Sequence, residues 1–258
     1  MPVIHCVCGY RMEGADDGAL FRAMRIHSDQ AHADLQITDQ SIRDILTARS
    51  RMTTWDGGRT SLASLPEIRA LGPERLDDFL RFFDRDAFMD NPIWASCYCF
   101  YHHFGGTDAE WDQRSGARNR EEKSALIRSG QAQGLLAYVD GRPVGWCHAA
   151  PRLSLPALDR SLEFRVDDAE RVGSIVCFVI AAPYRRQGVA RRLLDAACKR
   201  LRRQGFEYAE AYPLKHPMSD ARACQGPFAM YLAAGFSPYR ESERRAVVRK
   251  PLSPAAAR

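Results

Sequence analysis

The apolar residues of this chain follow two kinds of spacing, and these predict an alternation of strands and helices. Near-continuous apolar runs predict buried strands at Leu135–Val139, Val144–Ala149 and Val172–Ile180. The Asp140-Gly141 pair between the first two runs predicts a hairpin turn. Helical spacing predicts helices over 73–88, near 120–129 and over Val189–Arg203.

Weaker patterns predict the remaining elements of this half of the chain. They indicate strands at Glu67–Leu71, Tyr208–Pro213 and Ala246–Arg249, and a short helix over Pro227–Ala234. The aromatic segment 91–104, NPIWASCYCFYHHF, follows no single period. Elements of both kinds in alternation predict an α/β or α+β fold.

The first 64 residues have a different character. A strand at Val3–Tyr10, a helix capped by Asp16 or Asp17 and a short helix at Ser41–Ala48 predict a small α+β unit. A polar stretch with two adjacent glycines follows it. We therefore expect an accessory domain over 1–50, a linker over 51–64, a second domain over 65–250 and a frayed tail over 251–258.

Composition and charge narrow the class of protein. The 258 residues are 45% hydrophobic and 27% charged, which is typical of one or two globular domains and excludes a disordered or collagen-like chain. No apolar stretch reaches the roughly 18 residues that span a membrane, and no signal peptide is visible, so we expect a cytoplasmic protein without a membrane partner. Eight cysteines in that compartment indicate thiols or metal ligands rather than disulfides.

The most informative stretch is SIVCFVIAAPYRRQGVARRLL, where an apolar strand runs through a glycine-containing loop into a helix. Such a junction leaves backbone N–H groups unbonded at the helix N-terminus, where the helix dipole also favours an anion. Eight basic residues against one acid between Arg185 and Arg203 suit a phosphorylated ligand, the alternative being a solvated helix face. Nucleic acid is disfavoured because aliphatic rather than aromatic or amide side chains lie between the arginines.

Residues 185–190, RRQGVA, match the R/Q-x-x-G-x-G/A signature, and the chain thereby resembles the GNAT superfamily of acetyl-CoA-dependent N-acetyltransferases. Residues 228–236, FAMYLAAGF, resemble the family's second signature, and the order of elements over about 65–250 is similar. The alternative is an unrelated α/β loop. The resemblance implies a mixed, strongly twisted sheet, acetyl transfer to an amine in a ternary complex, and an acetyl-CoA site. The residues it implies for that site are Val179, Ile180, Arg185, Arg186, Gln187, Gly188, Val189 and Ala190.

The resemblance also implies catalytic residues. Tyr231 stands where many members keep the tyrosine that protonates the coenzyme A sulfur, the alternative being an aromatic residue that packs its helix. The central strand lacks the family's glutamate, so Glu210, His148, Glu163 or a water chain remain as candidates for the base. A non-catalytic acyl-CoA-binding regulatory or partner-binding protein is the alternative function. The acceptor and the oligomeric state stay open, a dimer included.

Two sets of cysteines are candidates for nucleophilic catalysis or for metal binding. Cys97 and Cys99, near His102 and His103, are either candidate nucleophiles or small buried hydrophobic residues. In the first unit, one candidate Cys₂His₂ zinc site consists of Cys6, Cys8, His27 and His32. Its H-x₄-H half fits zinc spacing, whereas C-x-C is tighter than usual, and the alternative is a small packed domain with polar histidines. This unit also resembles a small bacterial domain family of unknown function.

Overall fold

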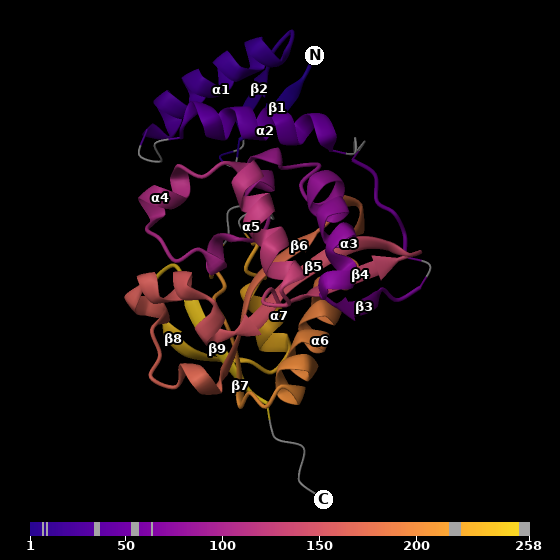
Figure 1. The fold of residues 1–258 in the computed structure, drawn as a ribbon, viewed down its shortest axis with the longest axis vertical. Coiled ribbons are helices and arrows are strands. Elements are labelled where there is room, and N and C mark those ends of the chain that lie inside the picture. The colour runs from indigo at the N-terminus through magenta and orange to yellow at the C-terminus, as the bar shows by residue number, and fades with distance from the viewer. Residues whose placement is uncertain are drawn as a thin grey trace, which may run out of the picture.

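The centre of the computed structural model is a mixed seven-stranded sheet with the order β3-β4-β5-β6-β7-β9-β8 (Figure 1). The structure describes residues 1–6, 8, 10–33, 37–52, 57–62, 64–216 and 223–252. The strands are β3 (Glu67–Ala70), β4 (Leu135–Val139), β5 (Arg142–Pro151), β6 (Val172–Ile180), β7 (Tyr208–Ala211), β8 (Ser237–Glu241) and β9 (Ala246–Pro251). Only β6 and β7 run parallel; the other neighbours are antiparallel. The predicted fold class is confirmed.

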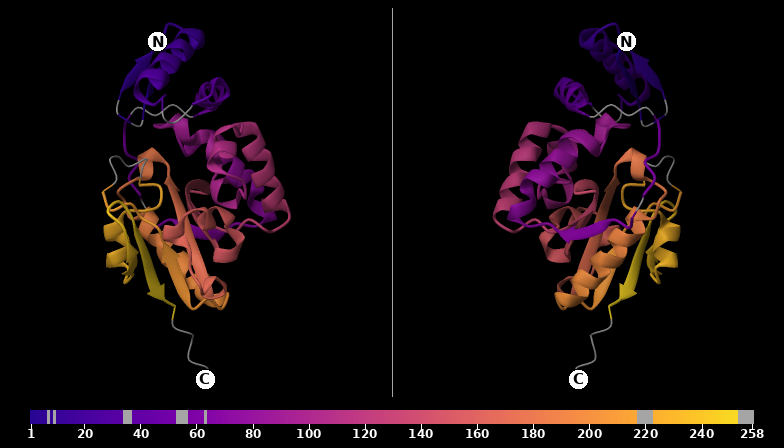
Figure 2. Two further views of the ribbon diagram at one scale, coloured as in Figure 1. Left: turned by 90° about the vertical axis from the view of Figure 1, so that its left-hand side faces the viewer. Right: turned by 90° about the vertical axis from the view of Figure 1, so that its right-hand side faces the viewer.

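Helices cover both faces of this sheet, and each face has its own apolar core (Figure 2). On one face lie α6 (Val189–Arg203) and α7 (Phe228–Ala233). The predicted stripe of α6, made of Leu193, Leu194, Ala197 and Leu201, is fully buried against the strands. On the other face lie α3 (Leu76–Arg81) and α5 (Gly116–Arg128), which pack over an aromatic core that includes Trp146. A single-turn helix, α4 (Asp108–Asp112), precedes α5.

The parallel pair at the middle of the sheet opens partway along its length. β6 pairs with β7 only from Val172 to Ile175, opposite Tyr208 to Ala211. Beyond that point β6 continues to Ile180 while it pairs only with β5. The carboxyl half of β6 therefore has an edge that β7 does not cover.

Several expected elements differ from the observed ones. The helix predicted over 73–88 is divided into a 3₁₀ turn, α3 and a π-helical turn at Phe82–Asp86, in which the Ala87 N–H reaches the Phe82 carbonyl. The aromatic segment forms two 3₁₀ turns, Pro92–Cys97 and Tyr101–His103. The exposed strand β8 was not predicted, because all five of its side chains are exposed and show no alternation. Pro251 belongs to β9 and Leu252 is buried, so the predicted tail begins too early; residues 253–258 lie outside the described part of the chain.

Residues 1–52, here called the N-terminal unit, fold around a separate small core. A hairpin of β1 (Val3–His5) and β2 (Arg11–Glu13) replaces the single strand predicted over 3–10. Asp16 caps α1 (Asp17–Ala31), and Thr38 caps α2 (Asp39–Arg51), which is longer than predicted.

The N-terminal unit lies at one end of the molecule, where α2 packs against the turn Pro92–Cys97 of the aromatic segment and against α5 (Figure 1). The Asp44 carboxylate of α2 accepts a hydrogen bond from the Gly116 N–H at 2.6 Å. A polar cavity of about 440 Å³ lies between α2 and α5. The following residues 57–62 run along the loop before α6, where the Thr60 N–H donates to the Pro183 carbonyl at 3.0 Å.

Candidate functional site

The loop between β6 and α6 forms a cradle of backbone amides. Gly188 is the N-cap of α6 with a φ of 81°, and a Cβ built on it would meet nothing within 4 Å. The first helical bond runs from the Arg192 N–H to the Gly188 carbonyl. The amides of Val189, Ala190 and Arg191 therefore point out of the first turn, where a phosphate group would find donors and the positive end of the helix dipole.

Two side chains of this loop are engaged within the protein. The Arg185 guanidinium donates to both oxygens of Asp90 and, through Nε, to the Ile180 carbonyl at 2.9 Å. Gln187 accepts from the Leu62 N–H at 3.1 Å and donates to the carbonyls of Thr60 and Pro183. Arg185 and Gln187 thus hold the loop and the linker in place, and the cradle itself is built from main chain.

Along the opened edge of β6, only every second residue points its backbone N–H and C=O groups outward. The Phe178 N–H points to this edge, where it donates to the Cys224 carbonyl at 2.5 Å, whereas the Ala181 N–H donates to Val144 of β5 at 3.0 Å. Because a strand alternates its backbone groups, those of Val179 face β5, opposite Trp146, and those of Ile180 face the opened edge. Of the two residues expected to pair with the pantetheine arm, Ile180 has the suitable orientation.

Tyr231 lies on α7 next to the opened edge and is fully buried. Its ring contacts those of Phe178 and Phe236, and its hydroxyl donates to the Gln225 carbonyl at 2.7 Å. Burial raises the pKa of Tyr231 well above its ordinary value, so the phenol keeps its proton at neutral pH. Both the packing role and the acid role are compatible with this position.

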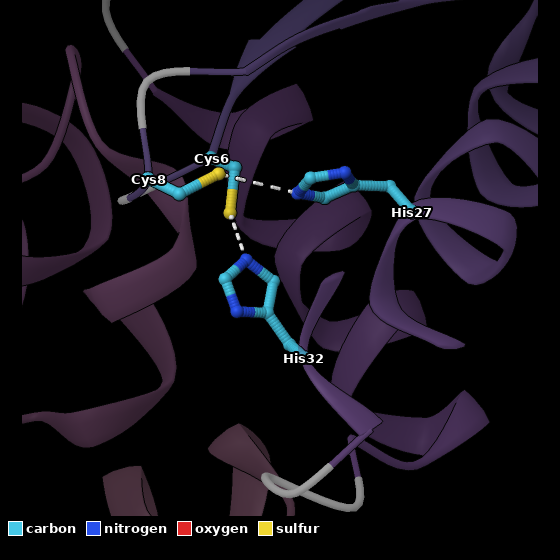
Figure 3. A group of neighbouring side chains, drawn as sticks. All are labelled: Cys6, Cys8, His27 and His32. Carbon is cyan, nitrogen blue, oxygen red and sulfur yellow. Dashed lines mark hydrogen bonds between the residues drawn. The ribbon is translucent and has the colours of Figure 1, made fainter. Parts of the chain in front are cut away.

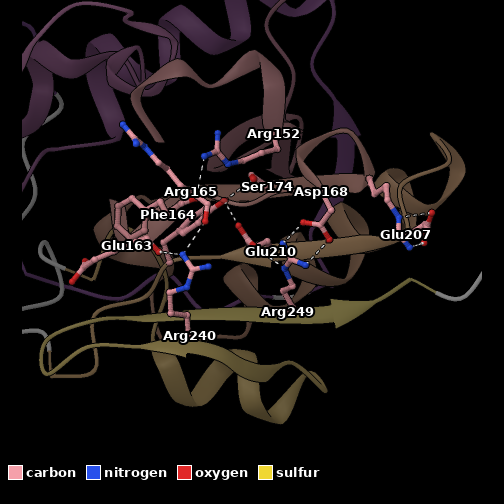
Figure 4. Close-up of polar contacts among 12 residues, drawn as sticks. Arg152, Glu163, Phe164, Arg165, Asp168, Ser174, Glu207, Glu210, Arg240 and Arg249 are labelled. Carbon is pink, nitrogen blue, oxygen red and sulfur yellow. Dashed lines mark hydrogen bonds and ion pairs between the residues drawn. The ribbon is translucent and has the colours of Figure 1, made fainter. Parts of the chain in front are cut away.

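Glu210, one of the candidate bases, is locked in a buried polar network (Figure 4). Its two oxygens accept from Arg249 Nε at 2.5 Å and from the Tyr212 hydroxyl at 2.7 Å. Arg249 also donates twice to Asp168, each time at 2.8 Å. With both oxygens bound, the Glu210 carboxylate joins β7 to β9.

The other two candidate bases, Glu163 and His148, differ sharply in how exposed they are. Glu163 is exposed on the turn Leu162–Phe164. His148 on β5 is fully buried, with its Nδ1 3.3 Å from the Cys99 sulfur. Among the described residues, its Nε2 has no hydrogen-bond partner.

His148 belongs to a group that we call the cysteine–histidine cluster, made of Cys99, Cys177, His102, His103 and His148. The rings of His103 and His102 lie 4.8 and 6.3 Å from that of His148. Sequence reasoning placed Cys99 near His102 and His103 and missed its contact with His148. Cys99 and His148 are 49 positions apart, and no local pattern indicates their contact.

A buried lysine, not predicted from the sequence, lies beside this cluster, and burial lowers its pKa. Lys123 is fully buried, donates to the Cys99 carbonyl at 3.3 Å and lies over the rings of Phe79 and Trp146. Burial, and then the Lys123 charge, lower the pKa of His148 well below its ordinary value. The imidazole is therefore neutral at pH 7.

The two cysteines of the aromatic segment have different electrostatics. Burial raises the pKa of Cys97 to about 12, which keeps it a thiol. Burial also acts to raise the pKa of Cys99, but the Cys177 thiol and the Lys123 charge outweigh it and lower that pKa. Cys99 is the more acidic thiol of the pair.

In the N-terminal unit the structure brings the four predicted zinc ligands together (Figure 3). The Cys6 sulfur lies 3.1 Å from His32 Nε2, and the Cys8 sulfur lies 3.4 Å from His27 Nε2. All four donor atoms lie within 4.8 Å of one another. We call these residues the N-terminal Cys₂His₂ group.

The mixed sheet, flanked by helices on both faces and with its parallel pair opening beside the N-terminus of α6, defines an α/β protein. Residues 98–223 match the model of the acetyltransferase (GNAT) family. These residues therefore match a domain of the GNAT acetyltransferase family, whose reaction is acetyl transfer from acetyl-CoA.

Solved structures with a similar arrangement are distant in sequence. An N-acetyltransferase from Staphylococcus aureus Mu50 is 12% identical, with 74% of this chain and 100% of that chain covered and a TM-score of 0.44. The PaiA N-acetyltransferase from Thermoplasma acidophilum in complex with coenzyme A is 13% identical over 73% and 99%, with a TM-score of 0.42. The GNAT domain of PAT from S. lividans is 14% identical over 72% and 90%, with a TM-score of 0.45.

No curated protein matches the chain. Among the described residues, no helix has the length and the apolar character that crossing a membrane requires.

Proposed function

We propose that this protein transfers the acetyl group of acetyl-CoA to an amine by direct attack within a ternary complex. The observation that carries this proposal is the continuity between the amide cradle at Gly188 and the opened edge of β6. A pantetheine arm that starts at the cradle would pass the Ile180 N–H and then the Cys224 carbonyl that binds the Phe178 N–H, toward Tyr231 and the cysteine–histidine cluster. Pyrophosphate at the cradle would meet the amides of residues 188–191.

The proposed chemistry needs a proton acceptor on the amine and a proton donor on the sulfur. The amine nitrogen attacks the thioester carbon and loses a proton to His148 Nε2. The carbon–sulfur bond then breaks, and the departing thiolate takes the proton of Tyr231, whose hydroxyl turns from Gln225 to the sulfur. His148 replaces Glu210 as our candidate base, because both Glu210 oxygens are bound.

The charges near the cluster favour an acceptor that carries an anionic group beside its amine. The cations of Arg160, Lys123 and Arg245 all act on His102, and burial together with them lowers its pKa to about 3. A polyamine would be repelled by this field, whereas the carboxylate of an amino acid would be attracted. We therefore propose an amino acid or a similar amine with a carboxylate as the acceptor class.

The test is a screen of amines for thiol release from acetyl-CoA, followed by mass spectrometry of the product. We expect turnover with carboxylate-bearing amines and little with polyamines of equal concentration. His148→Gln should lower kcat about 10² to 10⁴-fold, the usual range for loss of a general base, with acetyl-CoA affinity retained. The matched control is the exposed His216→Gln, which should keep full turnover.

Two outcomes would contradict the proposed mechanism. Acetyl-CoA binding without turnover on any amine would favour a non-catalytic acyl-CoA-binding protein. A gain of one acetyl group on the isolated enzyme, seen by intact mass and lost in Cys99→Ala, would establish an acyl-enzyme route through the thiol beside His148.

A further inference from the structure

The N-terminal Cys₂His₂ group joins two separate segments of the chain. Cys6 and Cys8 lie in the connection between β1 and β2, while His27 lies in the last turns of α1 and His32 is the C-cap of that helix. In both histidines the ring atom that faces a sulfur is Nε2. The side chains converge from the hairpin and from the helix on one point (Figure 3).

We propose that Cys6, Cys8, His27 and His32 bind one zinc ion in a closed structural site. Zinc–sulfur bonds of about 2.3 Å and zinc–nitrogen bonds of about 2.0 Å put tetrahedral ligand atoms about 3.3–3.8 Å apart. The four donor atoms already lie within 4.8 Å of one another, so small side-chain movements complete that geometry. Two thiolates and two imidazoles are a donor set that selects zinc over harder cations.

The surroundings of the group support a metal site. The ring of His27 stacks on that of Tyr10, with 4.6 Å between centroids and 6° between planes, which fixes the direction of its Nε2. The ring of His32 packs edge-on to His27 at 5.0 Å. Ligand rings held by their neighbours need little reorganisation when the metal enters.

The size of the unit gives the metal a structural purpose. Apart from Cys6, its core contains seven buried apolar residues, and each strand of its hairpin has only three residues. Domains near this size rarely gain enough from apolar burial alone and often use a metal. Zinc here would fix the hairpin to the end of α1, and four protein ligands would leave no open position for catalysis.

The first experiment measures metal in the full chain, purified without chelator. We expect close to one zinc per chain by elemental analysis, and exchange for cobalt(II) should give the visible absorption of a tetrahedral thiolate site. Cys8→Ser should lose the metal; Cys8 is exposed, so the fold should tolerate the change. Matched controls remote from the group, Cys198→Ser on α6 and His216→Gln, should keep one equivalent.

The proposal is overturned if the wild-type chain contains no zinc and its cobalt(II) titration shows no tetrahedral spectrum. It is also overturned if Cys8→Ser keeps a full equivalent with an unchanged cobalt spectrum. Neither readout depends on acetyl transfer, so a failure of this proposal and a failure of the proposed function are distinguishable.

Discussion

The acetyltransferase domain and the N-terminal unit are stabilised in different ways. The domain has a seven-stranded sheet with a large apolar core on each face, and its reactive groups lie where two strands separate. The unit has one small core and a group of four polar side chains that links its hairpin to α1. The difference teaches that apolar burial stabilises the domain, whereas the N-terminal unit has little burial and depends more on contacts between its polar side chains. Metal removal and substitutions should therefore affect one region and leave the other unchanged.

Metal removal should give the largest difference between them. Chelation should increase amide hydrogen exchange of residues 10–33 by about 10²-fold or more, because the unit loses the bonds that link hairpin and helix. The amides of β5 and β6 should keep their protection. Hydrogen exchange followed by mass spectrometry measures both regions at once, and re-addition of zinc is the control. Unchanged protection in both regions would show that the unit does not depend on a metal.

Gly188→Glu should act on the domain alone. Acetyl-CoA should raise the melting temperature of the wild-type chain, since it binds only the folded state, and the variant should lose this shift because bulk and negative charge enter the cradle. Gly205 is the matched control: it follows α6, has a φ of 90°, and a Cβ there would also meet nothing within 4 Å. Both variants place a side chain in the left-handed region, at about 1–2 kcal/mol each.

Only the control should retain the shift given by acetyl-CoA. If Gly188→Glu folds and keeps the full shift, the cradle is not the phosphate site.

Tyr231→Phe should have a smaller effect, limited to chemistry. We expect kcat to fall about 10–100-fold with loss of one acid while acetyl-CoA affinity changes little. Tyr98→Phe is the control, because Tyr98 is also buried and its hydroxyl donates to Asp84 at 2.7 Å, away from the opened edge. Steady-state kinetics of both variants give the comparison. Normal turnover of Tyr231→Phe would contradict the role of Tyr231 as the acid, while the mechanism of direct transfer would still stand.

Acid should weaken the domain through its buried histidines. Burial lowers the pKa values of His102, His103 and His148, so below about pH 6.5 the unfolded chain binds more protons than the folded one. Stability is thus fully present above about pH 6.5 and falls as pH approaches the folded pKa values. Each histidine contributes about 1.4 kcal/mol per pH unit in that window.

Urea unfolding between pH 7 and 5 measures this slope. His102→Gln should reduce it by about one proton. An equal slope in His102→Gln and the wild-type chain would show that His102 does not contribute to the pH dependence of stability.

Local pattern predicted the elements around the cofactor site well. Val172–Ile180 and Val189–Arg203 have the same bounds in sequence and structure, because a continuous apolar run and an unbroken helical stripe each carry their own signal. The site chemistry was less predictable, since it depends on contacts between distant residues. Arg249 donates a hydrogen bond to Glu210, which lies 39 positions earlier in the chain. The fold also buries Lys123 beside Cys99. Neither contact has a signature within a single segment.

Gln187 connects the two regions of the molecule. It belongs to the cofactor-loop motif, yet its side chain binds the linker at Thr60 and Leu62. Gln187→Ala should therefore lower stability by only about 1 kcal/mol, the net value of a hydrogen bond or two, and should leave acetyl-CoA binding nearly unchanged. Thermal unfolding with and without acetyl-CoA measures both quantities, and a lost ligand shift would contradict this role.

The contact of Gln187 with the linker has a consequence for how substitutions combine. In the full chain, replacement of Gln187 and Leu62→Pro should be non-additive, because the proline removes the main-chain N–H that donates to the Gln187 side chain. In a chain without the linker, the same replacement should cost less, because only the bond from Gln187 to the Pro183 carbonyl is left to lose. A saturation-mutagenesis scan of both versions would therefore assign position 187 two different tolerances, and the difference between them would measure the epistasis that the N-terminal segment imposes on a motif of the catalytic domain.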